Sequence, residues 1–221
     1  MKGKGIKGIG LINNQQKPSF TEEKKLAKQG YRLIAGVDEV GRGALAGPVV
    51  AAAVVLPRRL KGAWLDEVKD SKLLSQIKRE FLFHYIHETA ISIGIGLAPP
   101  QVIDALGIIK ATQLAMKTAI NQLSPPPESL LIDYMCLPEV SLHQKGITNG
   151  DRLCFSIACA SIMAKVARDR LMIELDRIYP GYGLAQHKGY CTEKHLSCLR
   201  RLGPCPIHRQ SFRPVRDTIE K

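Results

Sequence analysis

The chain has 221 residues, a length typical of one domain or of one domain with an appendage. Its hydrophobic share of 45% and charged share of 24% exclude a disordered, collagenous or coiled-coil protein. The formal net charge of +12 indicates a polyanionic partner, with nucleic acid as the leading candidate. This charge is concentrated at the two ends, in residues 1–32 and 185–221, while the middle is nearly neutral. A nearly neutral body with basic ends fits a protein whose periphery binds phosphates around an acidic centre. Solubilising tails fit the charge equally well.

No apolar run approaches the ~20 residues that a membrane-spanning helix needs, because the longest covers residues 48–56. The first residues alternate Lys and Gly and lack the apolar stretch of a secretory signal, so we expect a cytoplasmic protein with reduced thiols. Cysteine and histidine gather near the carboxyl end, but the spacing of seven between the cysteines favours packing over a zinc site. The residues concerned are Cys191, Cys198, Cys205, His195 and His208.

The amino-terminal region predicts a basic flexible tail followed by a short helix, together covering residues 1–30. Ser19 and Glu22 have the spacing of a capping box, and Gly30 is a suitable helix stop. Two apolar strands, at residues 33–37 and 49–56, are expected to follow as a hairpin around a glycine-bearing turn.

The rest of the chain alternates helical and strand patterns. Residues 75–88 predict a helix, and residues 91–97 alternate apolar and small residues as a strand does. A long helix is expected over residues 100–123, then a short strand at residues 130–132. A second long helix follows Asp151, and a basic helical extension covers about residues 185–221. This order predicts an α/β domain over residues 31–221 with a mixed sheet.

Four carboxylates stand where these elements begin or end. Asp38 and Glu39 follow the first strand, Asp133 follows the fourth, and Asp151 precedes the second long helix. Acidic side chains at strand ends converge on one sheet edge, and hard divalent cations prefer carboxylate oxygen. Taken singly, each residue fits a structural role equally well: Asp151 as a helix N-cap, Asp133 as a turn residue, and the other two as a solvated loop start.

The turn at residues 41–47 matches G-x-G-x-x-A, the phosphate-binding pattern of dinucleotide-binding folds. Two features weigh against this alternative. Asp38 and Glu39 would put negative charge beside a pyrophosphate, and the Val-rich run after Gly47 predicts a strand where that fold has a helix.

Residues 36–56, GVDEVGRGALAGPVVAAAVVL, resemble the first motif of the bacterial ribonuclease HII family, the type 2 ribonucleases H. Five further blocks follow in that family's order, and the resemblance spans about residues 31–215. These blocks are residues 70–75, residues 103–116 with Ile103, Asp104, Ala111, Thr112, Ala115 and Met116, residues 160–170, residues 187–190 and residues 208–212.

The resemblance implies a ribonuclease H-like fold, in which helices flank a mixed five-stranded sheet and a small basic helical extension follows. It also implies that Asp38, Glu39, Asp133 and Asp151 hold two Mg²⁺ or Mn²⁺ ions. Such ions, about 3.5–4 Å apart, activate the attacking water and stabilise the leaving 3′ oxygen. The implied substrates are RNA–DNA hybrids and DNA duplexes with single embedded ribonucleotides, which are nicked on the 5′ side to leave 3′-hydroxyl and 5′-phosphate ends. The enzyme is expected to act as a monomer.

The resemblance also implies which residues recognise the substrate. The 2′-hydroxyl distinguishes RNA from DNA at the sugar, and the implied contacts to it are the backbone of Gly41, Arg42 and Gly43 and the hydroxyl of Tyr190. Without the motif, Tyr190 fits a half-buried aromatic at a turn. The expected phosphate contacts are Ser71, Lys72, Lys165, Arg168, Lys188, His208 and Arg209, for each of which solvated surface charge is the alternative.

The chain departs from the family pattern at two notable positions. Tyr134 stands where glycine usually follows the third carboxylate, so the resemblance does not predict the conformation of the loop after Asp133. Gly107 stands where asparagine is usual and weakens the first long helix. Beside the nuclease, two other functions remain as alternatives: a nicotinamide-dependent oxidoreductase, from the glycine turn, and a non-catalytic nucleic-acid-binding protein, from the charge.

Overall fold

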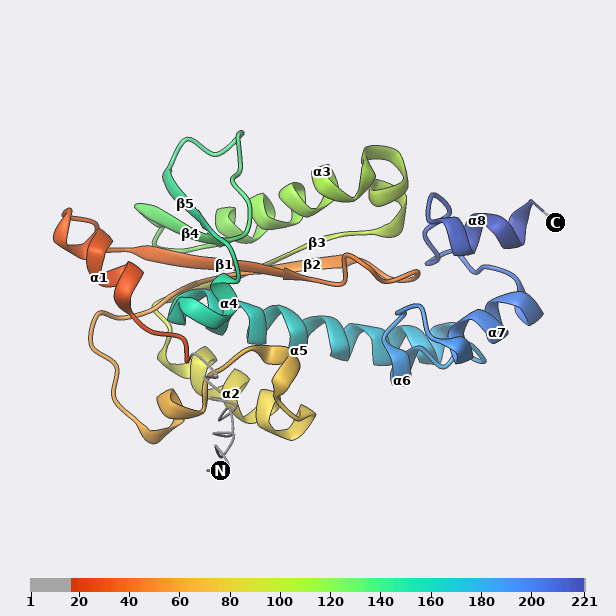
Figure 1. The fold of residues 1–221 in the computed structure, drawn as a ribbon, viewed down its shortest axis with the longest axis horizontal. Helices are drawn as coiled ribbons and strands as arrows, with labels where there is room; N and C mark the ends of the chain where they lie inside the picture. Colours follow the sequence, from red (N-terminus) through yellow and green to blue (C-terminus); the bar gives the residue numbers. More distant parts are fainter. Residues whose placement is uncertain (1–16, 221) are drawn as a thin grey trace, which may run out of the picture.

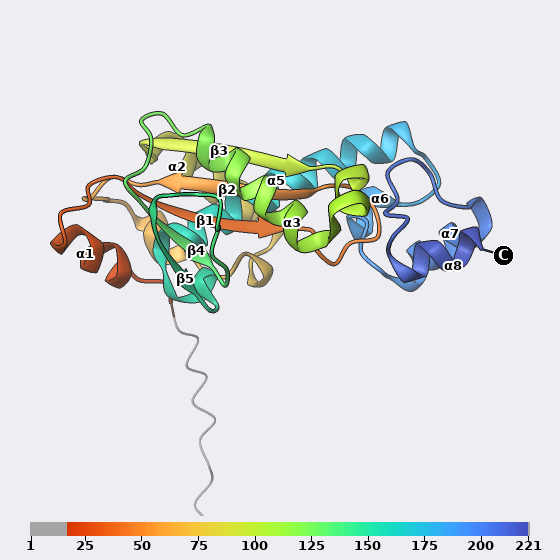
Figure 2. The ribbon, with the colours of Figure 1, turned by 90° about the horizontal axis from the view of Figure 1, so that it is seen from above.

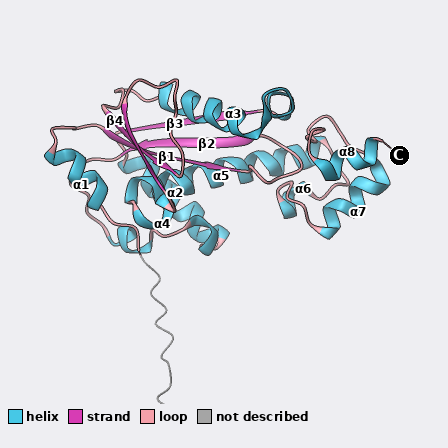
Figure 3. Cartoon of the chain, turned by 45° about the horizontal axis from the view of Figure 1, so that its top comes forward, coloured by secondary structure: helices cyan, strands magenta, loops and turns pink. Residues whose placement is uncertain are grey.

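The computed structural model describes residues 17–220, so most of the expected basic tail lies outside the described residues. Within them, a sheet lies between two layers of helices, and helices α6 to α8 extend from one end (Figures 1 and 3). The strands are β1 (Ile34–Val40), β2 (Val49–Val55), β3 (Ser92–Ala98), β4 (Ser129–Asp133) and β5 (His143–Ile147). The α-helices are α1 (Thr21–Lys28), α2 (Gln76–Thr89), α3 (Pro100–Asn121), α4 (Gly150–Leu153), α5 (Phe155–Ile178), α6 (Leu184–His187), α7 (Glu193–Leu202) and α8 (Arg213–Ile219). Two short 3₁₀ helices, η1 (Ala63–Glu67) and η2 (Ser71–Leu73), precede α2.

The sheet has the strand order β3-β2-β1-β4-β5 and is mixed, as predicted. Strands β1, β2 and β3 pair antiparallel, whereas β4 pairs parallel with both β1 and β5. The apolar run of β2 is buried along its whole length because helices cover both faces of the sheet. Strand β5 was not among the strands predicted from the residues, because its HQKGI sequence is polar and it lies at the sheet edge.

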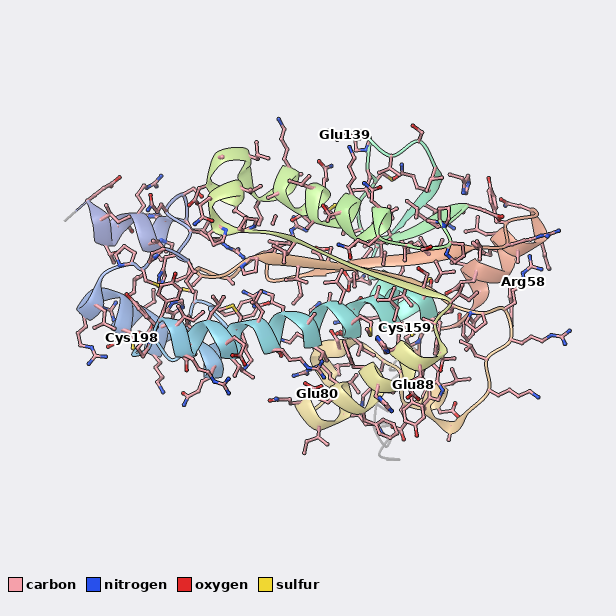
Figure 4. The ribbon with its side chains drawn as sticks, turned by 180° about the vertical axis from the view of Figure 1, so that it is seen from behind. Arg58, Glu80, Glu88, Glu139, Cys159 and Cys198 are labelled. Carbon is pink, nitrogen blue, oxygen red and sulfur yellow. The ribbon has the colours of Figure 1, made fainter. Side chains whose placement is uncertain are left out.

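Helix α3 covers one face of the sheet and α5 with α2 covers the other; Figure 2 shows α3 lying across the strands. Helix α5 approaches β1 closely at Gly36, where an added Cβ would lie 2.1 Å from the Ser156 carbonyl carbon. In Figure 4, Cys159 marks α5 beneath the sheet and Cys198 marks α7 at the far end. None of the helices between residues 17 and 220 is both long and apolar enough to span a membrane.

Two helix predictions need correction. Helix α1 begins at Thr21 with Phe20 as N-cap and without a side-chain cap, so the predicted capping box is absent. The Ser19 backbone pairs instead with Leu153 and Phe155, a tertiary contact. The expected continuous helix over residues 100–123 is interrupted at Gly107, whose φ of 76° is non-helical.

Candidate active site

Asp38 and Glu39 lie inside β1, not after it as predicted. The strand continues to Val40 because its last residues still pair with β2, where Asp38 is opposite Ala52 and Glu39 opposite Ala51. Asp38 is only 4% exposed and faces α5, and Glu39 projects to the opposite side of the strand. The first two carboxylates are therefore part of the sheet itself.

Asp133 ends β4, which runs parallel beside β1. Since Val37 is in register with Ile132, Asp38 and Asp133 occupy neighbouring positions on adjacent strands, whose backbones are typically about 4.8 Å apart. The strands thus bring the first three carboxylates to the same end of β1 and β4.

Asp151 is joined to this group through the turn that precedes it. It lies buried in α4, where Asn149 and not Asp151 is the N-cap residue. The neighbouring amide, that of Gly150, donates a hydrogen bond of 2.6 Å to Asp133 Oδ1. This bond ties the segment that carries the fourth carboxylate to the third.

The fold raises the pKa values of Asp38, Glu39 and Asp133, chiefly because it buries them and also because it places negative charges near one another. Burial raises the pKa of Asp38 well above its usual range, and the charges of Glu39 and Asp133 raise it further. Burial also raises the pKa of Glu39, which Arg42 partly offsets. For Asp133, burial raises the pKa while the Gly150 amide lowers it.

Two cationic side chains face the cluster. Arg42 Nη1 lies 3.3 Å from Glu39 Oε1, and Lys72 Nζ lies 3.5 Å from Asp151 Oδ2. Burial disfavours charge on Lys72, but the surrounding Asp151, Asp70 and Asp38 together raise its pKa. These two cations are too few to neutralise four carboxylates.

The donor set fits divalent cations. Oxygen ligands are those that Mg²⁺ and Mn²⁺ take, and Glu39 Oε2 is buried with no hydrogen-bond partner in the structure. A cation would satisfy that oxygen and relieve the repulsion that raises the pKa of Asp38. Across residues 17–220 no three acidic, histidine or cysteine side chains already surround one point as metal ligands. The carboxylates instead engage Arg42, Lys72 and the amide of Gly150, contacts that ion binding would rearrange.

The glycine loop, residues 41–47, connects β1 to β2 beside this cluster. Its far end leads directly into strand β2, which rules out the helix that a dinucleotide-binding fold would need there. Ala44 forms an isolated antiparallel bridge with Tyr190, so the structure brings the loop and this tyrosine together. Tyr190 is half-buried, and an added Cβ at Gly43 would meet no atom within 4 Å. Gly43 is open to solvent beside Tyr190.

The expected phosphate contacts divide into two groups. Lys72 is exposed, and Lys165 and Lys188 are half-buried; Lys165 Nζ lies 5.8 Å from the centre of the Tyr190 ring. Ser71 is buried, and its hydroxyl is 2.9 Å from that of Ser161. The other three residues, Arg168, His208 and Arg209, are at most 2% exposed.

These three residues cannot contact a phosphate in this conformation, which corrects their expected role. Both guanidinium groups donate to backbone carbonyls, and the His208 ring bonds to His195 and Cys205. Cys205 Sγ and His208 Nδ1 are 3.1 Å apart, and Cys198 packs in the same apolar cluster.

Two supporting residues were not predicted. Asp70 is 2% exposed, accepts hydrogen bonds from the Lys72 amide and from Arg152 Nε, and so holds Lys72 beside Asp151. Ser161, whose hydroxyl is 2.9 Å from that of Ser71, lowers the pKa of the neighbouring Asp38. Asp70 opens one of the quoted motifs, which was the available signal, whereas Ser161 looked like one of the small residues on the face of a packed helix.

Comparisons with known proteins agree with this architecture. A model of the family described as Ribonuclease HII matches residues 35–215. Ribonuclease HII of Dehalococcoides mccartyi is 56% identical over 203 residues, which cover 92% of this chain and 96% of the relative. The crystal structure of ribonuclease H2 from Pyrococcus horikoshii superposes with a TM-score of 0.71 at 25% identity, covering 85% of this chain and 97% of that one.

A second solved structure, Bst-RNase HIII in complex with Mn²⁺, has a TM-score of 0.66 at 20% identity over 85% of this chain and 69% of that one, which shows a shared fold. With the family model and the bacterial relative covering most of the chain, we conclude that it belongs to the ribonuclease HII family, whose members are metal-dependent endoribonucleases acting on RNA–DNA hybrids.

Proposed function

We propose that this endoribonuclease also nicks DNA duplexes immediately 5′ of a single embedded ribonucleotide, using two divalent cations, Mg²⁺ or Mn²⁺. The observation that carries the proposal is the crowding of four carboxylates, one with a buried unpartnered oxygen, next to a glycine loop that is bridged to Tyr190. One ribonucleotide offers a single 2′-hydroxyl, which the loop backbone and the Tyr190 hydroxyl would contact together.

Asp38, Glu39, Asp133 and Asp151 are the residues that would hold the cations. When bound, two such ions supply an activated water and stabilise charge on the scissile phosphate and on the leaving 3′ oxygen. The Mn²⁺ bound by Bst-RNase HIII, which has the same fold, supports this choice of ion. Attack of water at phosphorus, with cleavage of the bond to the 3′ oxygen, would leave the proposed 3′-hydroxyl and 5′-phosphate ends.

The chain's own residues would orient the substrate. The backbone of Gly41, Arg42 and Gly43 would contact the 2′-hydroxyl from one side, and the Tyr190 hydroxyl would contact it from the other, with the ring against the neighbouring sugar. Gly43 allows this approach because no protein atom occupies the space beside it.

Phosphate contacts would come from side chains around this centre. Lys72 stands beside Asp151, and Lys165 lies near the Tyr190 ring, so both flank the position proposed for the reacting nucleotide. Lys188, on the segment that carries Tyr190, is a further candidate, and Ser71, next to Lys72, would have to exchange its contact with Ser161 for the phosphate. Such contacts position a duplex without reading its sequence. We propose that one chain suffices for this site, because its described residues supply all four carboxylates and both parts of the 2′-hydroxyl contact.

The test is a gel assay with an end-labelled DNA duplex containing one ribonucleotide, run with Mg²⁺, with Mn²⁺ and with EDTA. We expect metal-dependent cleavage 5′ of the ribonucleotide, products that a DNA polymerase extends from their 3′ ends, and an uncut all-DNA control. An RNA–DNA hybrid run in parallel reports the general activity. Cleavage of the hybrid without cleavage of the single-ribonucleotide duplex would overturn the proposed nicking, and size-exclusion chromatography would test the monomer.

A further inference from the structure

The glycine loop is held between two segments that come from much later in the chain. On one side, the Leu45 amide donates to Gly189 O at 2.8 Å. On the other side, the Gly47 amide donates to Ile207 O at 2.9 Å, and the Arg209 amide donates to Leu45 O at 2.8 Å. The loop therefore lies between these two segments and is hydrogen-bonded to both.

Arg209 binds the loop with its whole guanidinium group. Nη2 donates to Gly41 O at 2.7 Å and to Gly47 O at 2.9 Å, Nε donates to Gly47 O at 3.0 Å, and Nη1 donates to Arg42 O at 2.8 Å. One side chain thus joins both ends of the glycine loop, and its planar fork sets the distance between them.

Arg168 connects the loop to the segment that carries Tyr190. Its Nη2 donates to Ala46 O at 3.2 Å, and its Nη1 donates to Lys188 O at 2.9 Å. The guanidinium carbon lies 5.3 Å from the centre of the Tyr190 ring. The fit is close, because an added Cβ at Gly41 would lie 2.1 Å from Arg168 Nε.

Neither guanidinium group has a carboxylate partner within 4.0 Å among the described residues, and both are 0% exposed. Carbonyl oxygens alone accept their hydrogen bonds. Burying two charges without counter-ions is an expensive way to stabilise a fold, since apolar side chains of similar volume often serve better. This cost indicates that the arginines serve the geometry of the loop.

We propose that Arg168 and Arg209 are positioning residues that set the spacing between the Gly41–Gly43 backbone and Tyr190 and thereby determine how strongly the enzyme prefers a ribonucleotide. The inference rests on the proposed function, in which these two elements contact the 2′-hydroxyl. A hydrogen bond from a group that is free to move loses much of its net value, and one such bond corresponds to about a tenfold change in binding.

The test compares Kd values for two DNA duplexes that differ by one 2′-hydroxyl, measured with Mg²⁺ in an Asp38→Asn background to prevent cleavage. We expect Arg209→Gln and Arg168→Gln each to reduce the preference for the ribonucleotide duplex by about tenfold, with little change in binding of the all-DNA duplex. Arg209→Lys should not rescue the preference, because an ammonium group cannot span the three carbonyls. Arg213→Gln, at an arginine that is 84% exposed on α8, is the matched control and should leave the preference unchanged.

The ratio of the two Kd values separates positioning from stability, because a smaller folded fraction weakens binding of both duplexes equally. A preference that is unchanged in both Gln variants would overturn the proposal while leaving the proposed function intact. The Asp38→Asn protein without an arginine substitution is the reference. If this protein binds both duplexes equally, although the wild-type protein prepared in the same way cleaves RNA–DNA hybrids, the proposed function is overturned and this inference with it.

A second measurement needs no variant and covers the case in which a Gln variant fails to fold. In the wild-type protein, the amides of Leu45 and Gly47 should exchange hydrogen slowly because the clamped loop rarely opens. Exchange of both amides as fast as in an open loop would overturn the proposal.

Discussion

The amide of Gly150 donates a hydrogen bond of 2.6 Å to Asp133 Oδ1, and this contact connects the third carboxylate of the site to the turn that carries the fourth. An added Cβ at Gly150 would lie 3.2 Å from Asp133 Oδ1 and 2.6 Å from Ile157 Cδ1. The site therefore depends on a glycine that is not itself a candidate ligand.

Gly150→Ala is expected to lower cleavage of an RNA–DNA hybrid by about tenfold or more, because a displacement of a few tenths of an ångström moves Asp133 from its position. Steady-state rates over a range of Mg²⁺ concentrations would show the loss, together with a requirement for more metal. Gly203→Ala, outside the site and where an added Cβ meets no atom within 4 Å, is a glycine-to-alanine control that should leave cleavage unchanged. Equal activity of the Gly150 variant and the wild type would show that Asp133 tolerates the change.

Asp38→Asn should reduce cleavage by at least about 1,000-fold, since a metal ligand supports several kcal/mol of transition-state stabilisation. The fold should persist, and the melting temperature without divalent cations should stay equal or rise, because the variant removes a buried charge beside Glu39 and Asp133. Added Mg²⁺ should then raise the melting temperature of the wild type more than that of the variant. Asp66→Asn, at an exposed position of η1, is the control. Full activity of Asp38→Asn would refute the metal site.

Much of this architecture could be predicted because burial leaves a pattern in the residues. Strands β2 and β3 are apolar or alternate with small residues, and the carboxylates stand out against them. Strand β5 left no such pattern, because an edge strand can be polar. Its pairing with β4 depends on the assembled sheet and not on its own residues. The extension of β1 through Asp38 and Glu39 likewise depends on its partner β2.

The buried arginines could not be predicted in this way. Arg168 and Arg209 are charged residues near a nucleic-acid site, and sequence alone favours the surface for them. Their burial requires the glycine loop to meet the Tyr190 segment and the carboxyl-terminal region, both of which lie more than a hundred residues after the loop in the chain. Only the assembled structure shows that backbone carbonyls accept all their hydrogen bonds, those of the glycine loop together with those of Pro48 and Lys188.

The paired imidazoles of His195 and His208 predict a pH-dependent stability. Their Nε2 atoms are 3.1 Å apart, so one ring donates and the other accepts. Burial, with a smaller effect of His195, lowers the pKa of His208 to about 4. In the unfolded chain this histidine takes up a proton near pH 6.5, whereas in the folded chain it does so only near pH 4. The free energy of unfolding should therefore fall as the pH decreases through this window, by about 3 kcal/mol from this group.

Urea unfolding at pH 7 and pH 4 measures this difference. Since other groups also titrate, the informative quantity is how much smaller the difference becomes in His208→Gln. His84→Gln, at a histidine whose side chain is 68% exposed, should behave as the wild type does. The same pH dependence in His208→Gln and the wild type would contradict the assignment.

Tyr134 adopts the backbone conformation that glycine favours, with φ of 62°, and its side chain is exposed. A residue with a Cβ thus occupies a left-handed position in the turn after Asp133, where the resemblance leads us to expect glycine. A left-handed conformation costs a residue with a Cβ about 1–2 kcal/mol, while glycine loses about 0.5–1 kcal/mol more conformational entropy on folding. Tyr134→Gly should therefore raise the free energy of unfolding by up to about 1 kcal/mol.

Tyr134→Ala separates the backbone from the ring, because alanine retains the Cβ and its strain but removes the aromatic group. Urea unfolding should show a gain for the Gly variant and none for the Ala variant. If both variants gain equally, the exposed ring is the source of the instability, and if the Gly variant is less stable than the wild type, the turn is not strained at this residue. Cleavage rates of the two variants then report what the ring contributes beside Asp133. Both variants lack the ring, but only the Ala variant keeps the strained backbone. An equal loss of cleavage in both would therefore assign the loss to a missing contact between the ring and the substrate.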